Sequence, residues 1–154
     1  MTSRYFQEAD AERLLREYPI GGAFLSGPAR LSRDALRALQ ETRFAALMRR
    51  AWQVPFYRRH WGAAGIEPGD IRGLDDLARL PAFSKSDLMA SVEAYPPFGD
   101  YHGMDDAFPH AVLHTTSGTT GTPQPLFFGP WDREVQNALL ARAYGNNNLP
   151  QSSN

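Results

Sequence analysis

The sequence predicts an α/β protein with a helical first half, then a strand–loop–strand hairpin and a final helix. Between residues 32 and 53, apolar side chains recur at helical spacing. Two short segments rich in strand formers, 111–115 and 126–128, enclose a loop of small and hydroxyl-bearing residues. A second amphipathic segment follows at 131–144, which predicts a helix directly after the hairpin.

Composition narrows the class of protein. The chain has 154 residues, is 42% hydrophobic and 21% charged, and carries a net charge of −1, which fits one ordinary soluble domain without a nucleic-acid partner. It has no cysteine, which excludes disulfides, thiolate metal sites and cysteine nucleophiles. It shows neither an apolar run of membrane-spanning length nor a signal-peptide core, so we expect a cytoplasmic protein with no membrane partner.

Three regions are expected along the chain. Residues 1–31 should form an N-terminal helix, up to about Tyr18, and then an irregular link rich in Gly and Pro. Residues 32–144 hold the main body of the domain. Residues 145–154 are polar and of low complexity, and we expect a disordered tail there.

The long helix should begin after Ser32, a good N-cap, and end near Gln53, because the residue before Pro55 is steered away from helical geometry. Its apolar stripe is interpreted as a face that packs into the core of a larger α/β body. The stripe consists of Leu36, Leu39, Phe44, Leu47, Met48 and Ala51. The basic residues near its end are interpreted as a solvated surface and not as a binding patch: Arg49, Arg50, Arg58, Arg59 and His60.

Two short helices are expected next. One spans Leu74 to Leu80 and is stopped by Pro81. The other is capped by Ser84, with Asp87 in the place that Glu takes in a capping box. Lys85, the only lysine, lies in the first turn of that helix without an evident acid–base partner, which favours a structural role.

A metal site at the histidines that precede the loop is rejected. If the segment between them is extended, His110 and His114 lie about 13 Å apart, at about 3.3 Å per residue. One zinc ion, with zinc–nitrogen bonds of about 2 Å, cannot bind both.

The loop itself, between His114 and Pro125, interleaves Ser117, Gly118, Thr119, Thr120 and Gly121. Glycines allow successive N–H groups to point at one position, and the hydroxyls add further donors, so the pattern favours a phosphate pocket. It is not a Walker A loop, because it contains no lysine and a strand follows it. A hairpin turn without a ligand is the alternative interpretation.

The stretch Ser117–Pro123 resembles the glycine-rich signature of the adenylate-forming superfamily. Two other stretches, 54–59 and 76–99, resemble motifs of its phenylacetate–CoA ligase-like branch. The resemblance covers roughly residues 32–144. It implies the N-terminal part of the large α/β domain of such an enzyme, with the hairpin as its phosphate-binding element.

The resemblance also implies a function. Members activate a carboxylic acid with ATP to an acyl-adenylate and transfer the acyl group to coenzyme A, with Mg²⁺ as cofactor. It assigns ATP phosphate binding to Ser117, Gly118, Thr119, Thr120 and Gly121. It assigns support of the loop to His114, Thr116, Thr122 and Pro123. The substrate is expected to be a small aromatic or other carboxylic acid.

This chain departs from the family pattern in two respects. Gln124 stands where other branches often place a phosphate-binding lysine. The family's catalytic and metal-binding motifs lie beyond the region of resemblance, so we expect no catalytic residue here and no activity from the chain alone. Two alternatives remain: a non-catalytic nucleotide-binding or interaction module, and a degenerate gene fragment.

Overall fold

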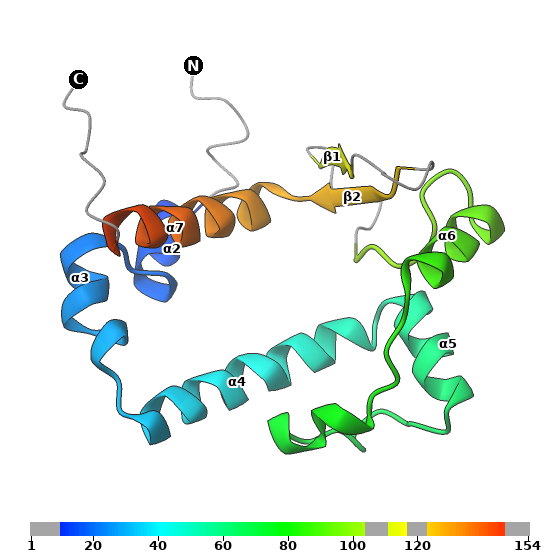
Figure 1. Ribbon diagram of the computed structural model, residues 1–154, viewed down its shortest axis with the longest axis horizontal. Coiled ribbons are helices and arrows are strands. Elements are labelled where there is room, and N and C mark those ends of the chain that lie inside the picture. Colours follow the sequence, from blue (N-terminus) through cyan, green and yellow to red (C-terminus); the bar gives the residue numbers. More distant parts are fainter. Residues whose placement is uncertain (1–9, 104–110, 117–122, 147–154) are drawn as a thin grey trace. The chain divides into compact units, whose positions relative to one another are not determined.

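The computed structural model describes residues 10–103, 111–116 and 123–146 (Figure 1). In this part of the chain, helices dominate, and the strands β1 (Val112–Thr115) and β2 (Pro125–Phe128) pair as a two-stranded antiparallel hairpin. The helices are α2 (Ala11–Glu17), α3 (Gly21–Ser26), η1 (Pro28–Arg30), α4 (Arg33–Ala51), α5 (Pro55–Ala63), η2 (Leu74–Arg79), α6 (Lys85–Ala94) and α7 (Pro130–Asn146). The predicted α/β class, helices first and then a hairpin and a helix, is confirmed.

The described residues form two compact units that do not follow the order of the chain. Unit 1 combines residues 10–33, 111–112 and 128–146, whereas unit 2 combines 34–103, 113–116 and 123–127. The predicted limits at residues 31 and 144 stay a prediction. None of the helices in these ranges combines the length and the apolar character that a bilayer span needs.

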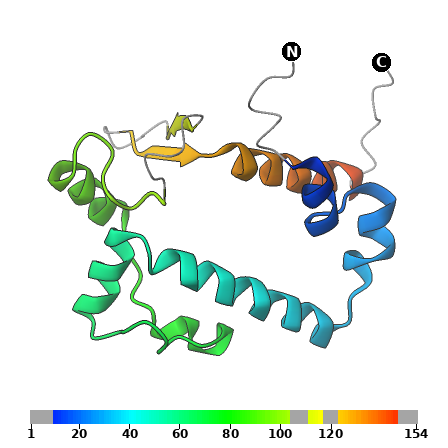
Figure 2. The same cartoon turned by 180° about the vertical axis from the view of Figure 1, so that it is seen from behind.

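In unit 1, the N-terminal helices pack on α7, as Figures 1 and 2 both show. Tyr18 contacts Trp131 edge to face at 6.5 Å, and the Arg13 guanidinium lies over the same indole at 4.4 Å. The Arg142 Nε donates to the Pro19 carbonyl oxygen at 2.8 Å. These contacts join segments at opposite ends of the sequence.

The expected irregular link at residues 19–31 is wrong, because it contains α3 and η1. The residues taken as helix breakers lie where helices accept them. Gly21, with φ of 54°, and Gly22 begin α3, and Pro28 is the first residue of η1. The Ser26 hydroxyl also donates to the Gly22 carbonyl oxygen at 2.8 Å, a bond that joins the two ends of α3.

Unit 2 holds two neighbouring apolar clusters. The first consists of Phe44, Met48, Trp61, Ile66 and Ile71, and the second of Val54, Phe56, Leu88 and Tyr101. The helix α5, which the sequence analysis did not predict, supplies Trp61 to the first cluster and Phe56 to the second. Pro55 begins this helix, a place where the missing N–H costs nothing.

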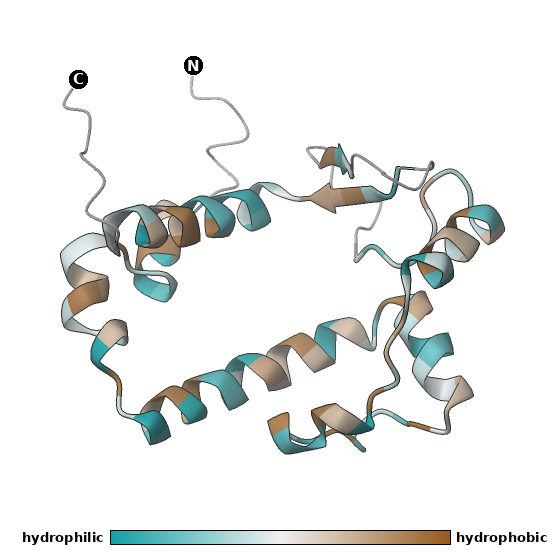
Figure 3. Ribbon diagram, viewed as in Figure 1, coloured by the Kyte–Doolittle hydropathy of each residue, from teal (hydrophilic) through white to brown (hydrophobic). Residues whose placement is uncertain are grey.

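The apolar stripe of α4 is buried only in part. Figure 3 shows apolar residues recurring along the helix. Phe44 and Met48 are buried, but Leu36 and Leu47 are 43% and 62% exposed. Nothing among the described residues covers those two leucines, so the packing of the whole stripe into the core of a larger α/β body stays a prediction.

Candidate functional site

The hairpin stem is closed at the point where the predicted phosphate loop begins. The Thr116 N–H donates to the Gln124 carbonyl oxygen at 3.2 Å, and the Gln124 N–H donates to Thr116 Oγ1, also at 3.2 Å. Thr116 thus uses both its backbone and its side chain to hold the two strands together. Of the predicted phosphate-binding residues, Ser117, Gly118, Thr119, Thr120 and Gly121 lie outside the described part of the chain, as does Thr122.

The other two residues assigned to loop support flank this closure. His114 lies in β1 with an exposed side chain, and Pro123 is exposed just before β2. Gln124, which replaces the lysine of other branches, is half-buried. Their supporting roles stay a prediction.

The exit strand of the hairpin is anchored to the segment that follows α6. The Tyr101 hydroxyl donates to the Pro125 carbonyl oxygen at 2.6 Å, and both residues are buried. The rings of Phe98 and Phe127 meet edge to face at 4.8 Å, and His102 lies 5.2 Å from Phe127. Residues 98–102 therefore form the support on which β2 rests.

Asp100 fixes this support to two helices. Its carboxylate accepts two hydrogen bonds from the Arg59 guanidinium of α5, one of them at 2.9 Å, and a third from the Ser91 hydroxyl of α6 at 2.8 Å. The Asp100 N–H donates back to Ser91 Oγ at 2.9 Å, and the Phe56 N–H donates to the Asp100 carbonyl oxygen at 3.4 Å. The Asp100 side chain is only 12% exposed, so these partners replace water around its charge.

The bonds to Asp100 stabilise its ionised form. The hydrogen bond from Arg59 is the main cause that lowers the pKa of Asp100 below its ordinary 3.8, burial opposes that shift, and Ser91 adds to it. Arg59 is half exposed, so water screens part of the attraction. The result is an anionic anchor directly beside Tyr101.

The basic residues lie at the surface, as predicted: Arg49, Arg50, Arg58 and Arg59 are exposed and His60 is half-buried, but four of the five also bond to neighbouring segments. Besides the pair with Asp100, the Arg50 guanidinium donates to the Gly103 carbonyl oxygen, and that of Arg58 donates to the Trp52 carbonyl oxygen at 3.2 Å. The His60 Nε2 lies 3.1 Å from the Ala82 carbonyl oxygen. These side chains tie α4 and α5 to neighbouring loops, a role that their spacing in the sequence does not reveal.

The predicted capping box at α6 is confirmed. Ser84 Oγ accepts from the Asp87 N–H at 3.3 Å, and the Asp87 carboxylate accepts from the Ser84 N–H at 2.6 Å. The bonds from the Ser84 side chain and backbone lower the pKa of Asp87. Lys85 is the first residue of this helix.

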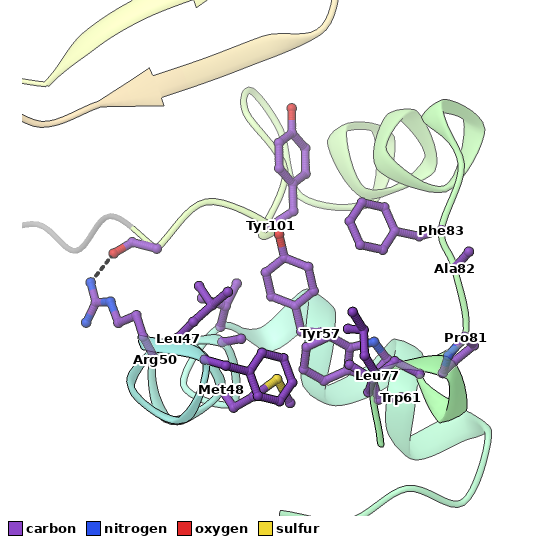
Figure 4. A pocket seen from close by; sticks show the side chains of 15 residues that line it. Leu47, Met48, Arg50, Tyr57, Trp61, Leu77, Pro81, Ala82, Phe83 and Tyr101 are labelled. Atoms are coloured by element: carbon purple, nitrogen blue, oxygen red, sulfur yellow. Dashed lines mark hydrogen bonds between the residues drawn. The ribbon is translucent and has the colours of Figure 1, made fainter. Parts of the chain in front are cut away.

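An apolar groove of about 520 Å³ lies in unit 2 (Figure 4). Aromatic and aliphatic side chains line it, among them Met48, Tyr57, Trp61, Leu77 and Phe83. Leu77 and Phe83 are 50% and 40% exposed, so the groove opens to the surface. Its character suits an apolar ligand or an apolar face of a partner more than a phosphate.

Residues 10–103, 111–116 and 123–146 contain no group of three or more acidic or histidine side chains that could hold a metal ion. Mg²⁺ as a cofactor stays a prediction.

Sequence reasoning missed Arg59, Ser91, Asp100 and Tyr101 as supports of the hairpin. Arg59 and Asp100 are 41 residues apart, and Tyr101 is 24 residues from Pro125, so no local pattern joins them. The sequence offers only a local signal there: Gly99 after two prolines indicates a turn, without naming its partners, and in the structure Gly99 has a φ of 77°.

No family model matches the sequence. The chain is 39% identical over 114 residues to a phenylacetate–coenzyme A ligase of Thermus thermophilus, which covers 73% of this chain and 24% of that protein. It is 36% identical over 113 residues to a phenylacetate–coenzyme A ligase of Aromatoleum evansii, with the same two coverages. The chain thus spans about a quarter of the length of these curated relatives.

Among solved structures, 2-hydroxyisobutyryl-CoA ligase in complex with 2-HIB-AMP and CoA superposes with a TM-score of 0.56 at 37% identity. The superposition covers 64% of this chain and 21% of that one. The sequence comparison and the structural comparison therefore both match the chain to CoA ligases.

Proposed function

We propose that this chain, which belongs to the phenylacetate–CoA ligase-like branch of the adenylate-forming enzymes, supplies the phosphate-gripping hairpin of an AMP-forming acid–CoA ligase. The similarity to ligases of known name over 73% of the chain carries the proposal. The closed stem at Thr116 and Gln124 supports it, because the bonds between these two residues join the strands that flank segment 117–122.

In the proposed reaction, the carboxylate of a small acid attacks the α-phosphate of ATP, and the bond to pyrophosphate breaks. Acyl-adenylate and pyrophosphate result, and the thiol of coenzyme A then displaces AMP. Negative charge grows on the departing pyrophosphate. Donors held in place before the reaction stabilise that charge without reorganising.

The residues of this chain contribute to the first half-reaction only. The hydroxyls of Ser117, Thr119 and Thr120, with nearby N–H groups, donate to the β- and γ-phosphate oxygens, and Gly118 and Gly121 give the backbone clearance. His114, Thr116, Thr122 and Pro123 shape the loop. No residue of this chain is assigned as catalytic, and we expect no turnover from the chain alone.

Binding and complementation test the proposal. The chain is titrated with pyrophosphate and with ATP, alongside Gly121→Val, which places a branched side chain where clearance is needed. We expect measurable affinity for the wild type and a large loss for the variant. Equal affinities would show that the loop is only a turn.

In the second arm, the remaining part of the Thermus thermophilus relative is added as a separate chain, and carboxylate-dependent release of pyrophosphate is measured. We expect release only from the mixture. Release from the 154-residue chain alone would contradict the expectation that it lacks catalytic residues.

The second candidate function is an interaction module without catalysis. The apolar groove around Tyr57, Trp61 and Phe83 favours it, because an open apolar surface of this kind is typical of a binding site. A chain that binds neither pyrophosphate nor ATP would favour this module over the ligase segment.

A further inference from the structure

We infer that Tyr101 is a positioning residue for the phosphate loop: its hydroxyl fixes β2, the strand that follows the loop. The inference rests on the proposed function. The Tyr101 side chain comes from the segment after α6, is 8% exposed, and donates to the Pro125 carbonyl oxygen at 2.6 Å. Figure 4 shows this hydroxyl pointing away from the apolar groove.

The bond matters because of the residue that receives it. Pro125, the first residue of β2, has no N–H, so its carbonyl is the only backbone group through which it can form a hydrogen bond. Pro125 is buried, so water does not readily replace a lost donor. Pro125 lies three residues after Thr122, and its position therefore sets where the loop ends.

Tyr101 can act as a fixed point because its own position is over-determined. Its ring meets Phe56 at 6.2 Å and belongs to the apolar cluster with Val54 and Leu88. The adjacent Asp100 is bonded to helices on both sides. The segment that carries the Tyr101 hydroxyl is thus held in place by two helices of unit 2.

This geometry has a consequence for phosphate binding. Hydrogen bonds to phosphate need donor–acceptor distances of about 2.5–3.2 Å and weaken steeply when the donor angle falls below about 120°. A supporting group that holds the donors in register contributes to affinity even though it never touches the ligand. Loss of the Tyr101 hydroxyl should therefore weaken phosphate binding, while the fold is retained.

The test compares Tyr101→Phe with Tyr57→Phe in the 154-residue chain. Tyr57 is a matched control, because it lies in the same aromatic cluster and no hydrogen bond of its hydroxyl is found among the described residues. Two quantities are measured: hydrogen exchange of the Thr116 and Gln124 amides, and affinity for pyrophosphate. Circular dichroism checks that all three proteins are equally helical.

For Tyr101→Phe we expect both amides to exchange about three- to tenfold faster and pyrophosphate to bind about three- to tenfold more weakly, as befits one neutral hydrogen bond. Tyr57→Phe should match the wild type in both. Unchanged exchange in Tyr101→Phe would refute its role in holding the hairpin. Faster exchange with unchanged affinity would show that the hydroxyl only stabilises the fold.

The failure of the proposed function gives a different result. If the wild type binds no pyrophosphate, the loop does not grip phosphate, and the phosphate part of this inference falls with it. The exchange rates still decide whether Tyr101 holds β2.

Discussion

Replacing Asp100 by Asn tests the anchor beneath the hairpin. Asn keeps the shape of the side chain but removes the charge of the carboxylate, which accepts two hydrogen bonds from Arg59. Hydrogen bonds to a charged group contribute about 1.5–3 kcal/mol when buried. Arg59 is 47% exposed, which weakens the interaction, so we expect the free energy of unfolding to fall by about 1–2 kcal/mol at pH 7.

The pH dependence gives this prediction a second, independent check. The folded-state pKa of Asp100 lies below 3.8, so the stabilisation is complete above about pH 5 and is lost as pH falls through that lower pKa. A protonated Asp resembles Asn. The difference between wild type and Asp100→Asn should therefore shrink steadily as pH falls toward 3.

Urea unfolding followed by tryptophan fluorescence, in steps from pH 7 to pH 3, measures both effects. Asp75→Asn is the matched control: Asp75 also pairs with an arginine, at 2.6 Å, but its side chain is 93% exposed. We expect little change from that variant at any pH. If the two variants behaved alike at pH 7, or if the Asp100→Asn deficit were as large at pH 3 as at pH 7, the anchor would not depend on charge.

Three other substitutions test separate features. Ser84→Ala removes the capping box of α6 and should cost about 1 kcal/mol in urea unfolding, whereas Ser84→Asp, another good N-cap, should cost much less. Gly99→Ala should be at least about 1 kcal/mol more destabilising than Gly65→Ala. Both glycines have positive φ. However, a Cβ at Gly99 would lie 2.7 Å from Ser91 Oγ, whereas a Cβ at Gly65 would meet no atom within 4 Å. Equal losses would mean that Ser91 moves aside freely. Leu47→Gln should change the free energy of unfolding by no more than about 0.5 kcal/mol, because Leu47 is 62% exposed. It should also reduce self-association in sedimentation velocity. A wild-type chain that is monomeric at high concentration would contradict this.

Features set by neighbouring residues were predictable from the sequence. The capping box of Ser84 and Asp87 follows from a four-residue pattern, and the hairpin follows from two short strand segments around a glycine-rich loop. The helices α3 and η1 were missed because the sequence analysis treated Gly21 and Pro28 as helix breakers without regard to their place in a helix. Glycine and proline break the middle of a helix but are accepted at its first residues.

The supports of the hairpin were not predictable, for a different reason. The bond from Tyr101 to Pro125 and the pair between Arg59 and Asp100 each join residues that become neighbours only through tertiary packing. A tyrosine or an arginine carries no sign of its distant partner. The phosphate loop is a different case: composition and family resemblance predict that residues 117–122 bind phosphate, and this role stays a prediction.

The packing of the N-terminal helices on α7 affects how the protein is made. Arg142 bonds to Pro19 and lies over the Phe24 ring at 4.6 Å, across a sequence separation of 123 residues in the case of Pro19. At about 5–20 residues per second, a ribosome needs roughly 6–25 s to synthesise that interval. During this time Tyr18 and Phe24 have left the ribosome without the helix that covers them. Unit 1 therefore cannot complete its folding until α7 has left the ribosome.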